Sequence, residues 1–211
     1  MSFLNVPQPA ILMSWYVVLW TALAIAPADW QNWALSSVIP ALVVVGLVAG
    51  RRSVPLSAAS YVMIGVFLTL HTIGAHYTYA RMPLGHELAS LIGTGRNDYD
   101  RIVHFAFGLL LASPLRDVVA RLTIARGALL YYLSVMTIVG LSGLWEILES
   151  WVAQLVSPEL GAAYLGSQGD VWDAQKDMAA ALYGALLWVV LSAWAHRRAA
   201  RDAGEPVPTR S

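Results

Sequence analysis

The chain has 211 residues, of which 58% are hydrophobic and 12% are charged. Soluble domains carry about 25% charged residues, so this composition excludes an ordinary soluble enzyme and makes the lipid bilayer the relevant solvent. The net charge is zero and no basic patch is interleaved with aromatic residues, which argues against nucleic acid as a partner. Cysteine is absent, so disulfides, thiolate metal sites and a cysteine nucleophile are excluded.

Six segments are apolar enough to cross a membrane, which takes about 20 residues of helix. The first lacks the basic segment that precedes a cleaved signal peptide, so we expect it to be retained. The sequence predicts an all-α, polytopic helical membrane protein with about six transmembrane helices. The expected spans are Ala10–Ala26, Leu35–Gly50, Ala58–Tyr79, Arg101–Ala120, Ala128–Val156 and Trp172–His196.

Basic residues follow the second, fourth and sixth expected spans, and six crossings would place these three segments on one side of the membrane. Arginine and lysine favour the cytoplasmic side, so we expect both termini inside. Residues 1–198 are expected to form one transmembrane domain and residues 199–211 a disordered cytoplasmic tail. The basic residues are Arg51, Arg52, Arg116, Arg121, Arg126, Arg197, Arg198, Arg201 and Arg210.

Two long segments are expected as loops on the outer side, Met82–Asn97 and Ser157–Val171. Both contain glycine and proline signals that are typical of turns. Most acidic residues of the chain lie in these loops or in the outer halves of the spans. We find no internal inverted repeat of the kind that marks many transporters.

Ionisable side chains inside a span are costly, so by default they indicate function. His71 and His76 end the third span, but five residues put them about 140° apart on a helix. They can contribute to one site only if two sides of the helix face the interior of the bundle, or if the helix unwinds locally near Gly74. The alternative for His71 is a hydrogen bond to a neighbouring helix. Asp100 and His104 share one face of the fourth span, where a carboxylate can co-ligate a metal or orient histidine as a base.

The fifth and sixth spans add carboxylates at the same depth. Glu146 and Glu149 lie three residues apart, a spacing found in metal sites of helical bundles. The alternative is that the helix has already left the membrane there and that water solvates both groups. In the sixth span, capping of the helix by Asp170 and Asp173 explains part of the pattern. It does not explain Asp177, which lies one turn deeper.

Two charged neighbours have plainer interpretations. Asp98 is expected to cap the fourth span by accepting hydrogen bonds from free backbone N–H groups. Arg101 is expected to be an interfacial anchor or a partner for the surrounding carboxylates.

The outer ends of four helices thus deliver histidine and carboxylate groups to one depth. Without sulfur ligands, a bound divalent metal would be held by nitrogen and oxygen, which suits zinc, manganese or iron. We predict Glu146 or Asp100 as the catalytic base or as support for the ligands. The predicted metal ligands are His76, His104, Glu149, Asp173 and Asp177, with His71 in either role.

Four stretches of the chain resemble the YjdF-type bacterial inner-membrane proteins. They begin at His71, Asp98, Trp145 and Leu165, and the resemblance covers about Ala58–Val190. The most specific stretch matches a pattern similar to Gly-Thr-Gln-Gly-Asp-x-Trp-Asp-x-Gln-x-Asp, with Ser167 at the threonine position. The resemblance implies the helical membrane fold, the inner-membrane location and the choice of polar residues. It implies no reaction.

Three functions fit this pattern. The first is a metal-dependent membrane hydrolase or transferase, whose metal would activate water for attack on a lipid or lipid-linked substrate from the outer leaflet. The second is a proton-coupled transporter that uses the same groups as a relay, although the inner halves of the spans are mostly Leu, Val and Ala. The third is a structural membrane protein in which a satisfied polar network joins the helices.

Overall fold

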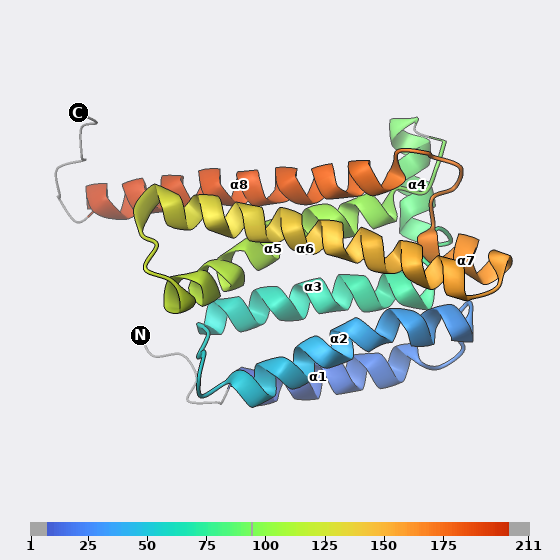
Figure 1. Ribbon diagram of the computed structural model, residues 1–211, viewed down its shortest axis with the longest axis horizontal. Helices are drawn as coiled ribbons and strands as arrows, with labels where there is room; N and C mark the ends of the chain where they lie inside the picture. Colours follow the sequence, from blue (N-terminus) through green and yellow to red (C-terminus); the bar gives the residue numbers. More distant parts are fainter. Residues whose placement is uncertain (1–7, 94, 203–211) are drawn as a thin grey trace.

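A computed structural model describes residues 8–93 and 95–202, and within them the only regular structure is helical. The helices pack as a bundle whose long members run alongside one another (Figure 1). The described residues form eight helices: α1 Gln8–Leu23, α2 Trp30–Gly50, α3 Ala58–His76, α4 Pro83–Ile92, α5 Tyr99–Leu122, α6 Gly127–Leu155, α7 Pro158–Leu165 and α8 Asp173–Asp202.

Helices α2, α3, α5, α6 and α8 are each long and apolar enough to cross a membrane. Helix α1 is apolar but shorter, with 16 residues and a length of about 24 Å at 1.5 Å per residue. The α2–α3 and α5–α6 connections lie at one end of the bundle, and α4 and α7 lie at the other (Figure 1). The prediction of an all-α, polytopic membrane protein is therefore confirmed.

The second span is longer than expected because its start has a cap that hydropathy does not register. Helix α2 begins at Trp30 and not at Leu35. The Asp29 side chain accepts a hydrogen bond from the backbone N–H of Asn32 at 2.8 Å, which satisfies one of the free donors at the helix start. With 21 residues, α2 has the length of an ordinary span.

Both outer segments expected as loops contain a helix. Each helix begins with proline in its first turn, Pro83 in α4 and Pro158 in α7. Each ends at a glycine in the left-handed region, Gly93 at φ 73° and Gly166 at φ 62°. Proline at the start and glycine just past the end are typical helix boundaries, so these signals were compatible with helices as well as with turns.

The C-terminal prediction needs a partial correction. Helix α8 continues to Asp202, so residues 199–202 are helical and do not belong to a disordered tail. Its last three turns are rich in polar residues, which suits a helix that leaves the membrane. Residues 203–211 lie outside the described part of the chain.

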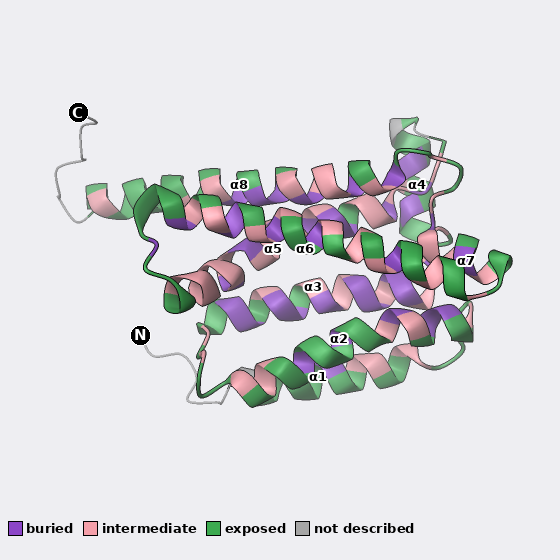
Figure 2. Ribbon diagram, viewed as in Figure 1, coloured by how far each residue is buried: buried purple, intermediate pink, exposed green. Residues whose placement is uncertain are grey.

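Two groups of buried side chains hold the bundle together. One joins α1, α2 and α3, and the other joins α5, α6 and α8. The outward faces of the long helices are largely exposed, as expected for surfaces that contact lipid (Figure 2). Between α5 and α8 the backbones approach closely, because a Cβ atom at Gly184 would lie only 2.1 Å from the Phe105 carbonyl oxygen.

Candidate functional site

Close packing of α5 against α8 brings together two polar pairs, Asp100–His104 on α5 and Asp173–Asp177 on α8, at the end of the bundle that carries α4 and α7. On α5, Asp100 and His104 precede Gly108 at intervals of four residues, so all three share one face. On α8, Asp177 precedes Ala181 by one turn. A Cβ atom at Gly108 would lie 1.9 Å from the Ala181 carbonyl oxygen, so the small residues set the helix spacing that places the polar pairs opposite each other.

The inner group, defined here as Asp100, His104, Asp177 and Glu146, is the part of the site best suited to a metal. Asp100, His104 and Asp177 each offer a ligand atom, and these atoms all lie within 4.8 Å of one another. His104 and Asp177 are buried, and Asp100 is half-buried. Nitrogen and oxygen ligands converging in this way match the donor set predicted from the sequence.

The imidazole of His104 is held so that one nitrogen faces the carboxylates. Its Nδ1 lies 3.3 Å from the Ser142 hydroxyl on α6. Its Nε2 lies 3.4 Å from Glu146 Oε1 and 3.7 Å from Asp100 Oδ1. Two ligands of one tetrahedral or octahedral ion, each about 2.1 Å from it, lie about 3.0–3.4 Å apart. The His104–Glu146 separation falls at the upper end of this range.

The inner group contains three carboxyl groups, and among the described residues one cation, Arg101, lies within ion-pair distance of them. Among the described residues, Glu146 Oε1 and Asp177 Oδ1 are buried and have no hydrogen-bond partner. The Arg101 Nε atom lies 4.0 Å from Asp177 Oδ1. Buried carboxylates have to be balanced by protons or by cations, so these oxygen atoms are suited to bind either.

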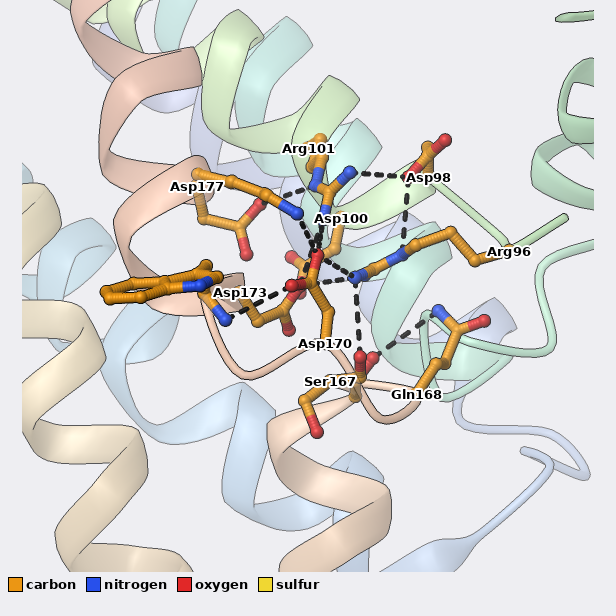
Figure 3. A network of polar contacts seen from close by, with 12 residues as sticks. Arg96, Asp98, Asp100, Arg101, Ser167, Gln168, Asp170, Asp173 and Asp177 are labelled. Atoms are coloured by element: carbon orange, nitrogen blue, oxygen red, sulfur yellow. Dashed lines mark hydrogen bonds and ion pairs between the residues drawn. The ribbon is translucent and has the colours of Figure 1, made fainter. Parts of the chain in front are cut away.

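A layer of ion pairs lies next to Asp100 and Asp177 and joins the α4–α5 and α7–α8 connections to the first turns of α5 and α8 (Figure 3). Arg96 Nη1 donates to Asp173 Oδ1 at 2.6 Å, and Arg101 Nη2 donates to Asp170 Oδ2 at 2.5 Å. Lys176 Nζ also donates to Asp170 Oδ2, at 2.6 Å. We call Arg96, Asp98, Arg101, Asp170, Asp173 and Lys176 the outer network.

Asp98 and Asp170 belong to this network more than to helix capping. Asp98 precedes α5, but its side chain makes no capping hydrogen bond and pairs instead with Arg101 at 3.1 Å. Asp170 accepts from the backbone N–H of Trp172, as a cap would. The hydrogen bond from Lys176 holds the pKa of the Asp170 carboxyl well below its usual range, with the Trp172 N–H adding to the effect.

The two histidines of α3 make hydrogen bonds of their own and do not belong to the inner group. His71 Nε2 lies 3.0 Å from the Ser36 carbonyl oxygen, and its Nδ1 lies 2.6 Å from the Tyr79 hydroxyl. His71 could ligate a metal only after losing one of these hydrogen bonds. His76 Nδ1 lies 2.8 Å from the Leu23 carbonyl oxygen, where it ties α3 to the end of α1.

The remaining predicted residues take different positions. Glu149 is buried on α6, so the alternative that water solvates it is wrong. Glu146 is also largely covered, with a side-chain exposure of 12%. Asp173 is buried and is engaged by Arg96 in the outer network. Burial raises the pKa of the Tyr164 hydroxyl to about 12, and the nearby Glu149 carboxylate adds to this.

Sequence reasoning missed the polar residues that fix the loops over the site. Gln168 receives a hydrogen bond from the Asn97 N–H at 3.0 Å and donates to the Asn97 carbonyl at 2.9 Å. The Asn97 side chain donates to the carbonyl of Met82 at 2.8 Å. Asn97 therefore joins three outer segments. The position of Gln168 within the most specific motif of the chain was the available signal for this role.

Two cavities occur elsewhere in the bundle. An apolar groove of about 390 Å³ lies between α1 and α3, with Trp15 and Thr69 on its wall. A hollow of about 460 Å³ lies at the opposite end of the bundle, beside Asp117 and Arg121. Neither is lined by a residue of the inner group, so neither identifies its substrate.

Comparison with known proteins places the chain in a family. The family described as "Predicted membrane protein (DUF2238)" matches residues 8–198. The inner membrane protein YjdF of Escherichia coli (strain K12) is 36% identical over 182 residues, which cover 85% of this chain and 86% of that protein. No solved structure matches the chain. The chain therefore belongs to the DUF2238 family of predicted membrane proteins and is an integral protein of the bacterial inner membrane.

Proposed function

We propose that the inner group binds a divalent metal ion and that the protein is a metal-dependent hydrolase or transferase. The observation that carries this proposal is the convergence of ligand atoms from Asp100, His104 and Asp177 in a mostly buried site. The spacing of Glu146 from His104 is that of two ligands around one ion. Zinc, manganese and iron all accept this donor set.

Each residue of the inner group then has a distinct role. Asp100, His104 and Asp177 would hold the ion, and Ser142 would fix the imidazole through Nδ1. Glu146 would be a fourth ligand or the base that takes a proton from the attacking water. The metal would supply Lewis acidity and lower the pKa of bound water toward neutrality.

The place of the site in the membrane supports a lipid or lipid-linked substrate. The inner group lies near the outer ends of α5, α6 and α8, close to the boundary between lipid and water. Trp151 on α6 and Trp172 before α8 are more than half exposed, as expected for side chains in an aromatic belt. A substrate with its reactive group at the headgroup level would reach this depth without crossing the bilayer.

Metal analysis of the detergent-purified protein tests the binding step. We expect about one zinc, manganese or iron per chain in the wild type and loss of this metal in both His104→Ala and Asp177→Asn. Glu159→Gln is the matched control, because it removes a carboxylate from an exposed position on α7. Full metal retention in folded His104→Ala, or no metal in reloaded wild type, would overturn the site.

An activity screen tests the reaction. Wild type reloaded with metal is expected to release headgroups or phosphate from a bacterial lipid extract, and the Glu146→Gln variant is expected to lose turnover. Retention of the metal in this variant would assign Glu146 as the base, and weaker metal binding would assign it as the fourth ligand. Stoichiometric metal without turnover on any lipid fraction would support the metal site and contradict the proposed hydrolase activity.

The outer network favours a second candidate function, a structural polar network. It joins the α4–α5 segment to the α7–α8 segment through Arg96 and Arg101, as a network that only holds helices together would. In that case, variants of the inner group would be less stable than the wild type, and their metal content would equal that of the wild type. Proton-coupled transport has less support, because the buried ionisable side chains among the described residues lie in the outer halves of their helices.

A further inference from the structure

Helix α4 has three distinct faces. Gly85 and Ala89 are one turn apart and buried against the protein. Leu84 and Leu91 lie seven residues apart, on the same side of the helix, and are 48% and 80% exposed. A third face is polar and consists of the exposed residues His86 and Ser90. With about 100° per residue, the centres of the three faces are about 120° apart.

The buried face fixes the helix to the rest of the site. A Cβ atom at Gly85 would lie 1.8 Å from Asn97 Oδ1, so only glycine allows this contact. Asn97 also donates to the Met82 carbonyl at the start of α4 and pairs with Gln168. The orientation of α4 is therefore set by the same residue that joins the outer loops.

The direction of α4 differs from that of the long helices. It stands across the outer ends of the bundle, and in this view it reaches past α8 (Figure 1). If the long helices cross the membrane, α4 runs roughly parallel to the membrane surface at the outer boundary. A helix in this position has one side toward lipid and one side toward water.

We propose that α4 is an interfacial helix whose exposed leucine face contacts the lipids of the outer leaflet. Two large side chains that are 48% and 80% exposed, Leu84 and Leu91, are costly in water and favourable among acyl chains. The polar face, which lies about 120° away, is then left in contact with water. The outward faces of the long helices are exposed and α4 lies across their ends, so lipid around the bundle can provide the contact without another protein. This proposal is independent of the metal site.

The chain has no cysteine, so single cysteine variants can be labelled without altering the background. Leu84→Cys and Leu91→Cys test the leucine face, and His86→Cys and Ser90→Cys are the matched controls on the polar face. Each variant is spin-labelled and reconstituted into vesicles of phosphatidylethanolamine and phosphatidylglycerol. Collision rates are then measured with oxygen, which concentrates in lipid, and with a water-soluble nickel chelate.

We expect labels at positions 84 and 91 to collide several-fold more with oxygen relative to nickel than labels at positions 86 and 90. Equal, nickel-dominated accessibility at all four positions would place α4 in water and overturn the proposal. Labels at 84 and 91 that are shielded from both reagents would show a protein partner or a second copy on this face, and would overturn it as well. Because all four positions are exposed in the monomer, substitutions there leave the packing intact.

Discussion

At the residue scale, His71 shows how a buried polar group in a membrane helix acquires a structural role. Pro40 lies inside α2 and has no N–H, so the carbonyl of Ser36, four residues earlier, loses its helical partner. His71 Nε2 donates to that carbonyl at 3.0 Å. A carbonyl in the hydrocarbon region has no water to bind, so the histidine supplies the hydrogen bond that the proline removed.

This pairing predicts a rescue. His71→Ala leaves the Ser36 carbonyl unsatisfied, and we expect a loss of about 1–3 kcal/mol in the free energy of unfolding. Pro40→Ala restores an N–H to α2, so the same histidine substitution should cost distinctly less in a Pro40→Ala background. Unfolding of the purified variants in mixed micelles measures the double-mutant cycle. Additive effects of the two substitutions would mean that His71 does not act through Ser36.

Asp170 predicts a pH dependence of stability. Its pKa is lowered in the folded protein, chiefly by the hydrogen bond from Lys176. A lowered pKa means that the stabilisation is fully present above the unfolded value, about 3.9 for aspartate, and is lost as the pH falls below it. We expect the melting temperature of wild type to fall between pH 5 and pH 3 more than that of Asp170→Asn. Parallel melting curves for the two proteins would contradict this.

Spacing along a helix predicted part of the site at this scale. Asp100 and His104 are one turn apart, so the sequence alone placed them on one face, and the structure shows their side chains 3.7 Å apart. The partner of Asp98 was not predictable in the same way. Local sequence favours a helix cap, whereas Arg101 and Arg96 compete for the same carboxylate once the chain is folded.

At the scale of the elements, the α5–α8 contact determines where the site forms. Gly108 and Gly184 let the two backbones approach until neither position has room for a Cβ atom. The polar pairs lie one to three turns from these glycines on the same faces. Helix spacing and ligand spacing are therefore coupled, and a change in the first should alter the second.

A pair of glycine substitutions tests this coupling. Gly184→Ala would place a Cβ 2.1 Å from the Phe105 carbonyl, and overpacking of this kind costs about 1–3 kcal/mol. Gly140→Ala on α6 is the control, because nothing lies within 4 Å of the added atom and alanine favours a helix by up to about 1 kcal/mol. We expect Gly184→Ala to melt at a lower temperature and to weaken metal binding, and Gly140→Ala to do neither. Equal stability of the two variants would refute the role of the contact.

Helices α4 and α7 mark the limit of prediction for the elements. Both are short, and hydropathy over a window of membrane length averages them with the polar residues around them. Their proline and glycine boundaries also occur in turns. What distinguishes them is packing: Gly85 lies against Asn97, and Gly161 lies against the α6 backbone at Ala153. Contacts between residues that are distant in the sequence could not be predicted from one sequence alone.

At the scale of the whole molecule, the distribution of arginine residues along the chain agrees with the arrangement of the helices. The connections that carry Arg51, Arg52 and Arg126 lie at one end of the bundle, next to Arg121 in the last turn of α5, and the inner group lies near the other end (Figure 1). Hydropathy and the positive-inside rule were sufficient to predict this arrangement, because both depend on composition along the chain and not on side-chain contacts. The register between helices, which brings the ligand atoms together, required the packed structure.

Reporter fusions at the connections between helices test the membrane topology. With six crossings, alkaline phosphatase fused after Gly93 or after Gly166 should be active, because both positions lie on the outer side. Fusions after Ser53 and after Thr123 should be inactive, and a fluorescent protein fused to the C-terminus should fold in the cytoplasm and fluoresce. The short helix α1 is tested by a fusion after Asp29, which should be active only if α1 crosses the membrane. Activity after Ser53 combined with inactivity after Asp29 would mean that α1 does not cross, and that the second span has the opposite direction.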